Sequence, residues 1–335
     1  MIKFDAFRDL LHRDVNFGLL LIACAMLMLA LVNPNVRLRH DNFDYLVVVD
    51  ITQSMNTLDY HQGNKPVSRL AFVKLALQRA LLRLPCGSKI GLGIFTEYRS
   101  FVLVQPVEIC ANYRELSTTL ADIDQRMAWV GSSEIAKGLY SGLRTATSLP
   151  GRPALVFITD GQEAPPVSPH HRPSFEGKPG EGKGLIIGAG GLVPMPIPKF
   201  DPEGRPLGYW RADEVLQTDP YSLGRGGSVE GEKMAETDEG TVVNLGATPG
   251  TEQLSSLREP YLQLLARETG LGYRRLASSS NLTTAFEDRD LARQQDARVG
   301  IAWIPALLAL ICLLGIYAFP IRYGNRTNNG RSVPG

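Results

Sequence analysis

The sequence has almost no excess of charge of either sign. Of its 335 residues, 35 are Lys or Arg and 34 are Asp or Glu, which gives a formal net charge of +1 at pH 7. A protein that binds nucleic acid through backbone phosphates carries a basic excess on one face or segment. The sequence has no such excess, and we therefore expect no nucleic-acid partner.

The sequence also lacks complete motifs for nucleotide binding. Residues 177–184 nearly form a phosphate-binding loop, but they end in Gly where Ser or Thr is needed, and they precede a strand-like run. Residues 188–191 follow a strand-like run, but Val193 stands where a dinucleotide-binding fingerprint needs its last Gly. No order of Ser, His and Asp favours a hydrolase. These absences favour a binding protein over an enzyme.

Two long runs contain no charged residue: residues 17–32 and residues 300–321. A membrane-spanning helix needs roughly 20 apolar residues. The second run has that length, and Trp303 and Tyr317 near its ends are of the type that anchors a span at the membrane surface. The first run is short, and a cleaved signal peptide is its alternative, although no small-residue cleavage site follows Leu31. We expect two transmembrane helices.

Basic residues flank both runs on their outer sides. Lys3, Arg8 and Arg13 precede the first run, and Arg322, Arg326 and Arg331 follow the second. The positive-inside rule then places the segments 1–16 and 322–335 in the cytoplasm, although Arg37 and Arg39 on the inner flank count against it. We therefore expect a protein of the bacterial inner membrane whose central domain faces the periplasm.

The chain has only four cysteines. Cys24 and Cys312 lie inside the apolar runs and are interpreted as small packing residues. Cys86 and Cys110 flank two strand-like runs, and a hairpin centred near Glu97–Tyr98 would place them opposite each other, within reach of a disulfide. The alternative is two unrelated buried thiols.

Strand-like and helix-like segments alternate between the apolar runs. Unbroken runs rich in β-branched residues, typical of strands buried on both faces, occur at 45–50, 153–160 and 184–188. Two strand-like runs at 89–95 and 101–107 would form the hairpin, and a last short strand is expected at 272–276. Helical spacing occurs at 67–84, 112–123, 133–147 and 259–269. This alternation predicts an α/β fold with a doubly wound, mostly parallel sheet and helices on both faces.

Two of the predicted helices contain notable polar residues. Arg69 is one of several basic residues that interrupt the apolar face of the first helix, and Ser132 or Ser133 could cap the third. The predicted domain covers residues 44–280, between a linker at 33–43 and a juxtamembrane segment at 281–299. A Pro- and Gly-rich insertion at about 161–250 interrupts it. Loops of that length are usually functional or mobile.

Polar side chains gather where predicted strands end. Asp50 ends one buried strand and opens a D-x-T-x-S string, and Asp160 ends another and precedes Gly161. Between them, residues 131–135 (GSSEI) open a helix. Ligands of doubly wound sheets bind beyond the carboxyl ends of the strands. These three loops are therefore expected to form one site.

Together the three loops resemble the metal-ion-dependent adhesion site of von Willebrand factor A domains. That family usually has D-x-S-x-S in the first loop, a Thr in the second and an Asp before Gly in the third. The resemblance implies a divalent cation held by Asp50, Thr52, Ser54, Ser133 and Asp160. Ser133 corresponds to the Thr by its spacing from Ile135, and Ser132 is the alternative. The other interpretation is that these side chains only satisfy nearby backbone N–H groups.

The implied chemistry is that of a docking site. Hard cations such as Mg²⁺ prefer oxygen ligands and retain waters. In this family's pattern neutral hydroxyls bind directly and the acids act largely through water, which leaves a position open for a carboxylate of a client protein. Mg²⁺ is the cation that we expect, with Ca²⁺ and Mn²⁺ as alternatives.

Two narrower resemblances concern function. The order of membrane segment, domain and C-terminal helix, with the strings GLIIGAGG, P-I-P and D-x-x-G at residues 184–204, is similar to bacterial aerotolerance-type membrane proteins. The strings DITQSM at 50–55 and TDGQEAPP at 159–166 resemble the MxaL-type accessory proteins of methanol oxidation clusters. That family is associated with the maturation of a periplasmic, calcium-dependent methanol dehydrogenase.

These resemblances imply an accessory or assembly factor that grips a client protein, with other proteins of the same pathway as further partners. Two alternatives stay open. One is a homo-oligomerising membrane module of an aerotolerance-type complex. The other is a metal-dependent hydrolase, against which the lack of an evident general base argues.

Overall fold

The computed structural model describes the chain except for residues 1, 33, 225–232, 237–243, 247–249 and 319–335. The chain divides into two compact units. One comprises residues Asp41–Gln294, and the other comprises Met1–His40 together with Gln295–Gly335. Every residue predicted to bind the cation belongs to the first unit.

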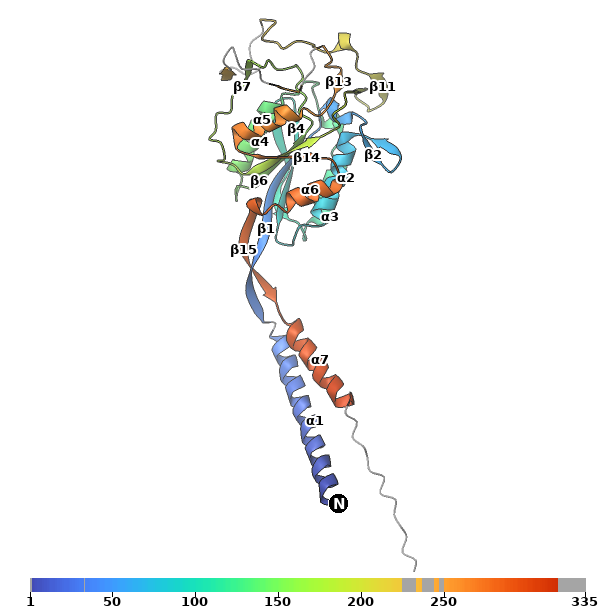
Figure 1. Cartoon of the computed structure of the whole chain (residues 1–335), viewed down its shortest axis with the longest axis vertical. Helices are drawn as coiled ribbons and strands as arrows, with labels where there is room; N and C mark the ends of the chain where they lie inside the picture. Colours follow the sequence, from blue (N-terminus) through green and yellow to red (C-terminus); the bar gives the residue numbers. More distant parts are fainter. Residues whose placement is uncertain (1, 33, 225–232, 237–243, 247–249, 319–335) are drawn as a thin grey trace, which may run out of the picture. The chain divides into compact units, whose positions relative to one another are not determined.

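A central sheet forms the middle of the larger unit (Figure 1). Its strand order is β14 (Gly272–Leu276), β8 (Gly184–Ala189), β6 (Ala154–Thr159), β1 (Asn35–Asp50), β4 (Lys89–Thr96) and β5 (Arg99–Glu108). All neighbours in this order are parallel except β4 and β5, which are antiparallel. β15 (Ala292–Gly300) pairs with β1 off this path. The predicted mostly parallel α/β sheet is confirmed.

Helices cover both faces of the sheet, and β1 shows how. Its residues Tyr45, Val47 and Val49 pack in the core with α2 (Arg69–Leu81), α3 (Tyr113–Asp122) and α6 (Ser279–Phe286). The intervening Leu46 and Val48 pack in a second core with α4 (Ile135–Ser148) and α5 (Glu259–Thr269). Figure 1 shows these two groups of helices on opposite sides of the strands. Because both faces are buried, β1 has no polar alternation near its end.

Several local sequence signals produce the expected element ends. α5 and β14 occupy the ranges predicted for them, and Gly270 ends α5 in the left-handed region with φ of 75°. α2 begins after Ser68, whose Oγ accepts a 3.2 Å hydrogen bond from the backbone N–H of Ala71. Such capping by a serine hydroxyl satisfies an otherwise unpaired N–H of the first helical turn.

The strands β4 and β5 form the predicted hairpin, with its turn at Glu97–Tyr98. At the open end of the hairpin Lys89 pairs with Glu108. Just beyond this pair, a disulfide joins Cys86 and Cys110, whose Cα atoms are 5.3 Å apart. The structure therefore joins the two cysteines that the hairpin register was expected to bring together.

Regular structure that was not predicted from the sequence occurs on both sides of the predicted domain. β1 begins at Asn35, within the predicted linker, and β15 lies in the predicted juxtamembrane segment. Main-chain pairing between two strands does not require apolar side chains, so these polar stretches carry little sequence signal. α6 also extends past residue 280. The carbonyl of its Phe286 accepts a 2.8 Å hydrogen bond from the Tyr45 hydroxyl, which fixes this helix to β1.

The other unit contains α1 (Ile2–Leu31) and α7 (Trp303–Ala318), which pack against each other. In the described part of the chain, no helix is both long and apolar enough to cross a membrane. The predicted second span includes residues 319–321, and these residues and the basic tail at 322–335 lie outside the described residues. Neither predicted transmembrane helix is found among the described residues, and both stay predictions.

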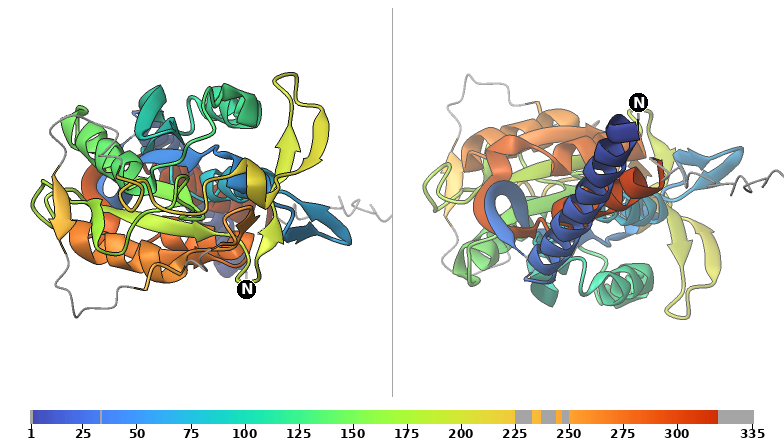
Figure 2. Two further views of the ribbon diagram at one scale, coloured as in Figure 1. Left: turned by 90° about the horizontal axis from the view of Figure 1, so that it is seen from above. Right: turned by 90° about the horizontal axis from the view of Figure 1, so that it is seen from below.

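Short paired strands occur around β8, in the predicted insertion and directly after it. These are β7 (His171–Pro173), β9 (Met195–Pro196), β10 (Pro198–Phe200), β11 (Pro206–Tyr209), β12 (Met234–Glu236) and β13 (Leu254–Ser255). The antiparallel pairs are β7 with β12, β9 with β13, and β10 with β11. The β10–β11 hairpin projects on the same side of the unit as the hairpin of β2 (Tyr60–Gln62) and β3 (Lys65–Val67) (Figure 2). Parts of the insertion, at 225–232, 237–243 and 247–249, lie outside the described residues.

Removing the disulfide is expected to destabilise the larger unit. The two cysteines are 24 residues apart, and for a loop of that size the chain-entropy model gives about 3 kcal/mol. The double variant Cys86→Ala/Cys110→Ala should lose up to that amount of unfolding free energy in urea titrations, whereas Cys24→Ala should lose little. Thiol labelling of the denatured, non-reduced chain should modify Cys24 and Cys312 only. Labelling of all four cysteines before reduction would contradict this prediction.

Candidate functional site

The three predicted loops meet at one edge of the sheet. β1 and β6 are parallel neighbours, with Val49 opposite Ile158, so the residues that follow them emerge together. Asp50 is the last residue of β1, and Asp160 follows β6 directly. Ser133 stands two residues before α4 and makes backbone bridges to the loops after β4 and β6. All five residues predicted to bind the cation are buried, namely Asp50, Thr52, Ser54, Ser133 and Asp160.

Asp50 organises the first loop. Its Oδ1 accepts hydrogen bonds from the backbone N–H of Thr52 at 2.8 Å and from the Thr52 hydroxyl at 2.7 Å. Its Oδ2 accepts one from the Thr159 hydroxyl at 2.6 Å. Burial, followed by the negative charge of Asp160, raises the pKa of Asp50 to about 7 despite these bonds. A cation bound nearby would have the opposite effect on this pKa, because it favours the ionised form.

Ser54 lies within the 3₁₀ helix that follows, η1 (Gln53–Asn56). Its hydroxyl oxygen is 3.4 Å from that of Thr52. The two hydroxyls of the first loop are therefore adjacent, as the D-x-T-x-S spacing requires for joint binding of one ion.

The N-terminus of α4 is capped differently from the prediction. Neither Ser132 nor Ser133 caps it. Glu163, from the loop after β6, instead accepts hydrogen bonds from the backbone N–H groups of Ile135 at 2.8 Å and Ala136 at 3.1 Å. A carboxylate is well placed at a helix N-terminus, where the partial charge is positive. Burial raises the pKa of Glu163 to about 7. The capping prediction was wrong because this cap comes from a distant loop.

This arrangement leaves the Ser133 hydroxyl without a partner. Its backbone N–H donates to the carbonyl of Ala164 at 2.6 Å, and its carbonyl accepts from the N–H of Ala164 at 2.8 Å. Its Oγ, however, is buried and makes no hydrogen bond within the described part of the chain. An unpaired buried hydroxyl is costly unless it has a ligand. Ser132, the alternative ligand, is only half-buried.

Asp160 has a cationic partner that the sequence analysis did not predict. Its Oδ2 forms an ion pair with Nη1 of Arg69, the first residue of α2, and accepts a 3.1 Å hydrogen bond from the Ser255 hydroxyl. Its Oδ1 accepts from the backbone N–H of Gln162 at 3.0 Å. A carboxylate oxygen has two lone pairs, so Oδ1 keeps one for a further ligand or for a water.

Arg69 is completely buried, although the sequence analysis took it for a basic interruption of an apolar helix face. Its Nε and Nη2 donate to Oδ2 of Asp59 at 2.9 and 2.7 Å. Nη1 donates to the Ser255 hydroxyl at 2.6 Å, and Nη2 donates to the Ser255 carbonyl at 3.1 Å. One sequence signal was available, because a basic residue in the first turn of a helix opposes the helix dipole and needs a specific partner.

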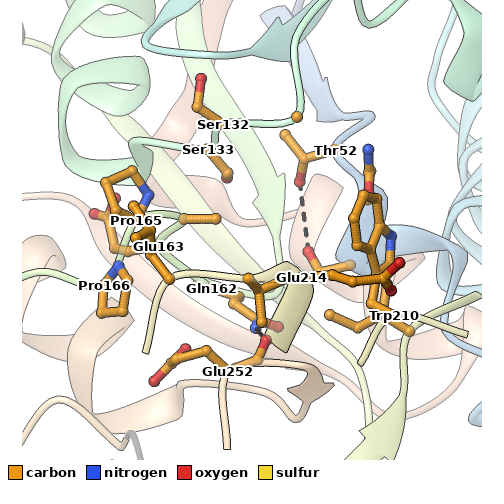
Figure 3. Close-up of a pocket in the computed structure, with 17 residues that line it drawn as sticks. Thr52, Ser132, Ser133, Gln162, Glu163, Pro165, Pro166, Trp210, Glu214 and Glu252 are labelled. Atoms are coloured by element: carbon orange, nitrogen blue, oxygen red, sulfur yellow. Dashed lines mark hydrogen bonds between the residues drawn. The ribbon is translucent and has the colours of Figure 1, made fainter. Parts of the chain in front are cut away.

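A cavity of about 310 Å³ adjoins the three hydroxyls (Figure 3). In Figure 3, Ser133 and Thr52 lie at the top, Pro165 and Pro166 on the left and Trp210 on the right. The remaining lining comes from all three loops and from the insertion and comprises Gln53, Ser54, Gly131, Ser132, Gln162, Glu163, Ala164, Ile197, Glu214, Val215, Leu216 and Glu252. The hydroxyls thus face a space that could hold a cation and its ligand, with the two acids behind them.

One other group of metal-binding side chain types occurs among the described residues, formed by Cys86, Glu108 and Cys110. Both thiols of this group are consumed by the disulfide, so they offer no thiolate to a metal. The hydroxyl oxygens of Thr52 and Ser133 are better ligands for a hard cation such as Mg²⁺ than the sulfur atoms of Cys86 and Cys110.

Comparison with known proteins yields no family, since no family model and no curated protein matches the chain. Among solved structures, the chain is similar to an aerotolerance-related membrane protein from Bacteroides fragilis, with 17% identity and a TM-score of 0.45 over 74% of this chain and 99% of that one. It is also similar to the PilB minor pilin from Streptococcus sanguinis, with 11% identity and a TM-score of 0.40 over 76% and 64% of the two chains. An uncharacterised membrane-spanning protein from Vibrio fischeri gives 17% identity and a TM-score of 0.27.

Replacing Arg69 is expected to destabilise the domain strongly. Arg69→Leu leaves the carboxylates of Asp160 and Asp59 buried without their cation, and breaking a buried ion pair in this way costs about 3–5 kcal/mol. Arg79→Leu is the matched control, because Arg79 lies on the same helix and is exposed. Its loss should stay within about 0.5 kcal/mol. Denaturant titration measures both, and equal stability of the two variants would refute the role of Arg69.

Proposed function

We propose that the domain holds one divalent cation through the hydroxyls of Thr52, Ser54 and Ser133, and that this cation binds a carboxylate of a partner protein. The observation that carries the proposal is the Ser133 hydroxyl, which is buried, unpaired within the described chain and adjacent to the cavity that Thr52 and Ser54 also line. Mg²⁺ is the expected ion, with Ca²⁺ and Mn²⁺ as alternatives, since all three accept oxygen ligands.

The buried charges support a divalent ion. With Asp50 ionised, Asp50, Asp160 and Asp59 carry three negative charges against the one positive charge of Arg69, which contacts the last two. A divalent cation would neutralise the difference within this cluster. Asp50 holds the Thr52 hydroxyl by a direct hydrogen bond, and Arg69 fixes the carboxylate of Asp160. The acids would then attract the ion and orient its surroundings, while neutral hydroxyls contact it.

We propose binding and not catalysis at this site. A metal-dependent hydrolase needs a general base within hydrogen-bond reach of the attacking water. Glu163 lines the cavity, but its carboxylate already accepts bonds from the start of α4 and a 2.5 Å bond from the Tyr261 hydroxyl. We propose that its role is to cap α4.

We further propose that the domain is anchored in the bacterial inner membrane and faces the periplasm. The apolar runs at 17–32 and 300–321 and their basic flanks favour this topology. The bond between Cys86 and Cys110 supports it, because disulfides persist in oxidising compartments. Thiol labelling, as described for the hairpin, tests this placement together with the disulfide.

Cation binding should depend on the second-loop hydroxyl. Isothermal titration of the detergent-solubilised chain with Mg²⁺ should show one site per chain. Ser133→Ala should weaken binding by roughly tenfold, as expected when one ligand worth about 1.4 kcal/mol is lost, and Asp50→Asn should weaken it further because a charge is removed.

Ser132→Ala is the matched control and should bind Mg²⁺ like the wild type. The opposite result, in which Ser132→Ala weakens binding and Ser133→Ala does not, would assign the ligand to Ser132. Undiminished binding in all three variants would refute the site.

The partner is proposed from the strings at 50–55 and 159–166, which resemble the MxaL-type accessory proteins. The protein would act as an accessory or assembly factor for a periplasmic enzyme such as a calcium-dependent methanol dehydrogenase. Such an enzyme should co-purify with the tagged full chain from solubilised membranes, and addition of EDTA or Asp50→Asn should release it. Self-association that survives both treatments, with no enzyme captured, would favour the homo-oligomerising membrane module instead.

A further inference from the structure

The cavity beside the proposed cation has an apolar part built largely by the insertion. Pro165 and Pro166 line it from the loop after β6, and Ile197, Val215 and Leu216 line it from the insertion. Main-chain hydrogen bonds hold this wall in place. The carbonyl of Ile197 accepts a 3.0 Å bond from the N–H of Trp210, and β9, which precedes Ile197, pairs with β13.

The charges around the cavity restrict what can enter it. Among the described lining residues there is no Lys or Arg. The lining glutamates are already engaged, since Glu214 pairs with Lys199 at 2.6 Å and Glu252 lies 3.5 Å from Arg258, and Glu163 caps α4. Since no described lining residue is basic, we expect an anionic group of a ligand to bind the proposed cation and the rest of the ligand to be uncharged.

Besides the Ser133 hydroxyl, two polar groups of the lining lack partners within the described chain: Oε1 of Gln162 and the indole N–H of Trp210. The orientation of the Gln162 amide is determined by its Nε2, which donates to the carbonyls of Glu252 at 3.0 Å and Leu254 at 3.2 Å. One unpaired acceptor and one unpaired donor remain. A peptide unit offers the complementary N–H and C=O, and pairing such buried groups is favourable.

We propose that the occupant is a short extended segment of the partner protein in which an Asp or Glu adjoins a bulky apolar residue. The acid binds the cation, the apolar side chain fills the compartment near Leu216, and the peptide unit pairs with Gln162 and Trp210. A volume of about 310 Å³ suits one large side chain with its adjacent main chain, because it lies at the lower end of the range for ligand pockets. This inference rests on the proposed function, since the acid needs the cation.

The test uses fluorescein-labelled hexapeptides and the detergent-solubilised full chain in Mg²⁺. The peptides Gly-Gly-Phe-Asp-Gly-Gly and Gly-Gly-Asp-Phe-Gly-Gly cover both residue orders. Matched peptides carry Ala in place of Phe, or Asn in place of Asp. Fluorescence anisotropy measures binding, and protein-free micelles correct for partition of the peptides into detergent.

In at least one order, the Phe peptide should bind at least about tenfold more tightly than the Ala peptide, because burial of a large apolar side chain favours binding. The Asn peptide and the addition of EDTA should abolish binding. The advantage of Phe should disappear in Leu216→Glu and shrink in Leu216→Ala. Leu207→Glu is the control, because Leu207 is an exposed residue of the same insertion that does not line the cavity.

Calorimetry with Mg²⁺ tests cation binding separately from peptide binding. Unchanged Mg²⁺ affinity in Leu216→Glu shows that the variant is folded and that its cation site is intact. If Mg²⁺ binds but Phe and Ala peptides differ by less than threefold in both orders, or if Leu216→Glu keeps the Phe advantage, the peptide inference is wrong and the cation proposal stands. Absence of Mg²⁺ binding in the wild type would overturn both.

Discussion

The guanidinium of Arg69 is buried between two carboxylates, and the geometry of the site depends on this arrangement. An isolated charge could not be buried at this depth, so Arg69, Asp160 and Asp59 must be placed together. The same guanidinium donates to the hydroxyl and the carbonyl of Ser255. Since Ser255 belongs to β13, which pairs with β9, Arg69 connects the acid at the end of β6 with the strand pair from which the apolar wall of the cavity continues. Arg69 thus contacts residues from both the loop after β6 and the strand pair of β9 and β13.

The backbone N–H groups at the start of α4 are bonded by Glu163 and not by a serine hydroxyl. A serine at the N-cap position would ordinarily cap the helix with its hydroxyl, but Glu134 occupies that position and Ser133 stands one residue before it. Glu163 performs the capping in this structure, and the Ser133 hydroxyl is left unpaired. The first loop alone does not make this distinction, because the bond from the N–H of Thr52 to Asp50 is what a simple loop cap would also show. Ser133 is the residue that favours a ligand site over that alternative.

The candidate site contains buried carboxyl groups at one edge of an otherwise apolar sheet, and burial of their ionised forms is unfavourable. Burial raises the pKa values of both Asp50 and Glu163 to about 7, which reflects the cost of their ionised forms there. The strands beneath offset that cost, since residues 45–49 of β1 and 155–158 of β6 are completely buried. A rigid core that supports a poorly compensated polar edge is a common arrangement at binding sites, because the missing compensation is left for the ligand.

The sequence by itself determined the parts of this protein that depend on neighbouring residues. Apolar runs and helical spacing predicted the strands and helices, the symmetry of the hairpin about Glu97–Tyr98 paired Cys86 with Cys110, and the acids at strand ends indicated the candidate site. The tertiary structure alone decided the burial of Arg69, the capping by Glu163 and the apolar wall around Leu216. Arg69 and Asp160 are 91 residues apart, and Ile135 and Glu163 are 28 apart. No local pattern specifies such partners, because their contacts arise only when the sheet aligns the loops at its carboxyl edge.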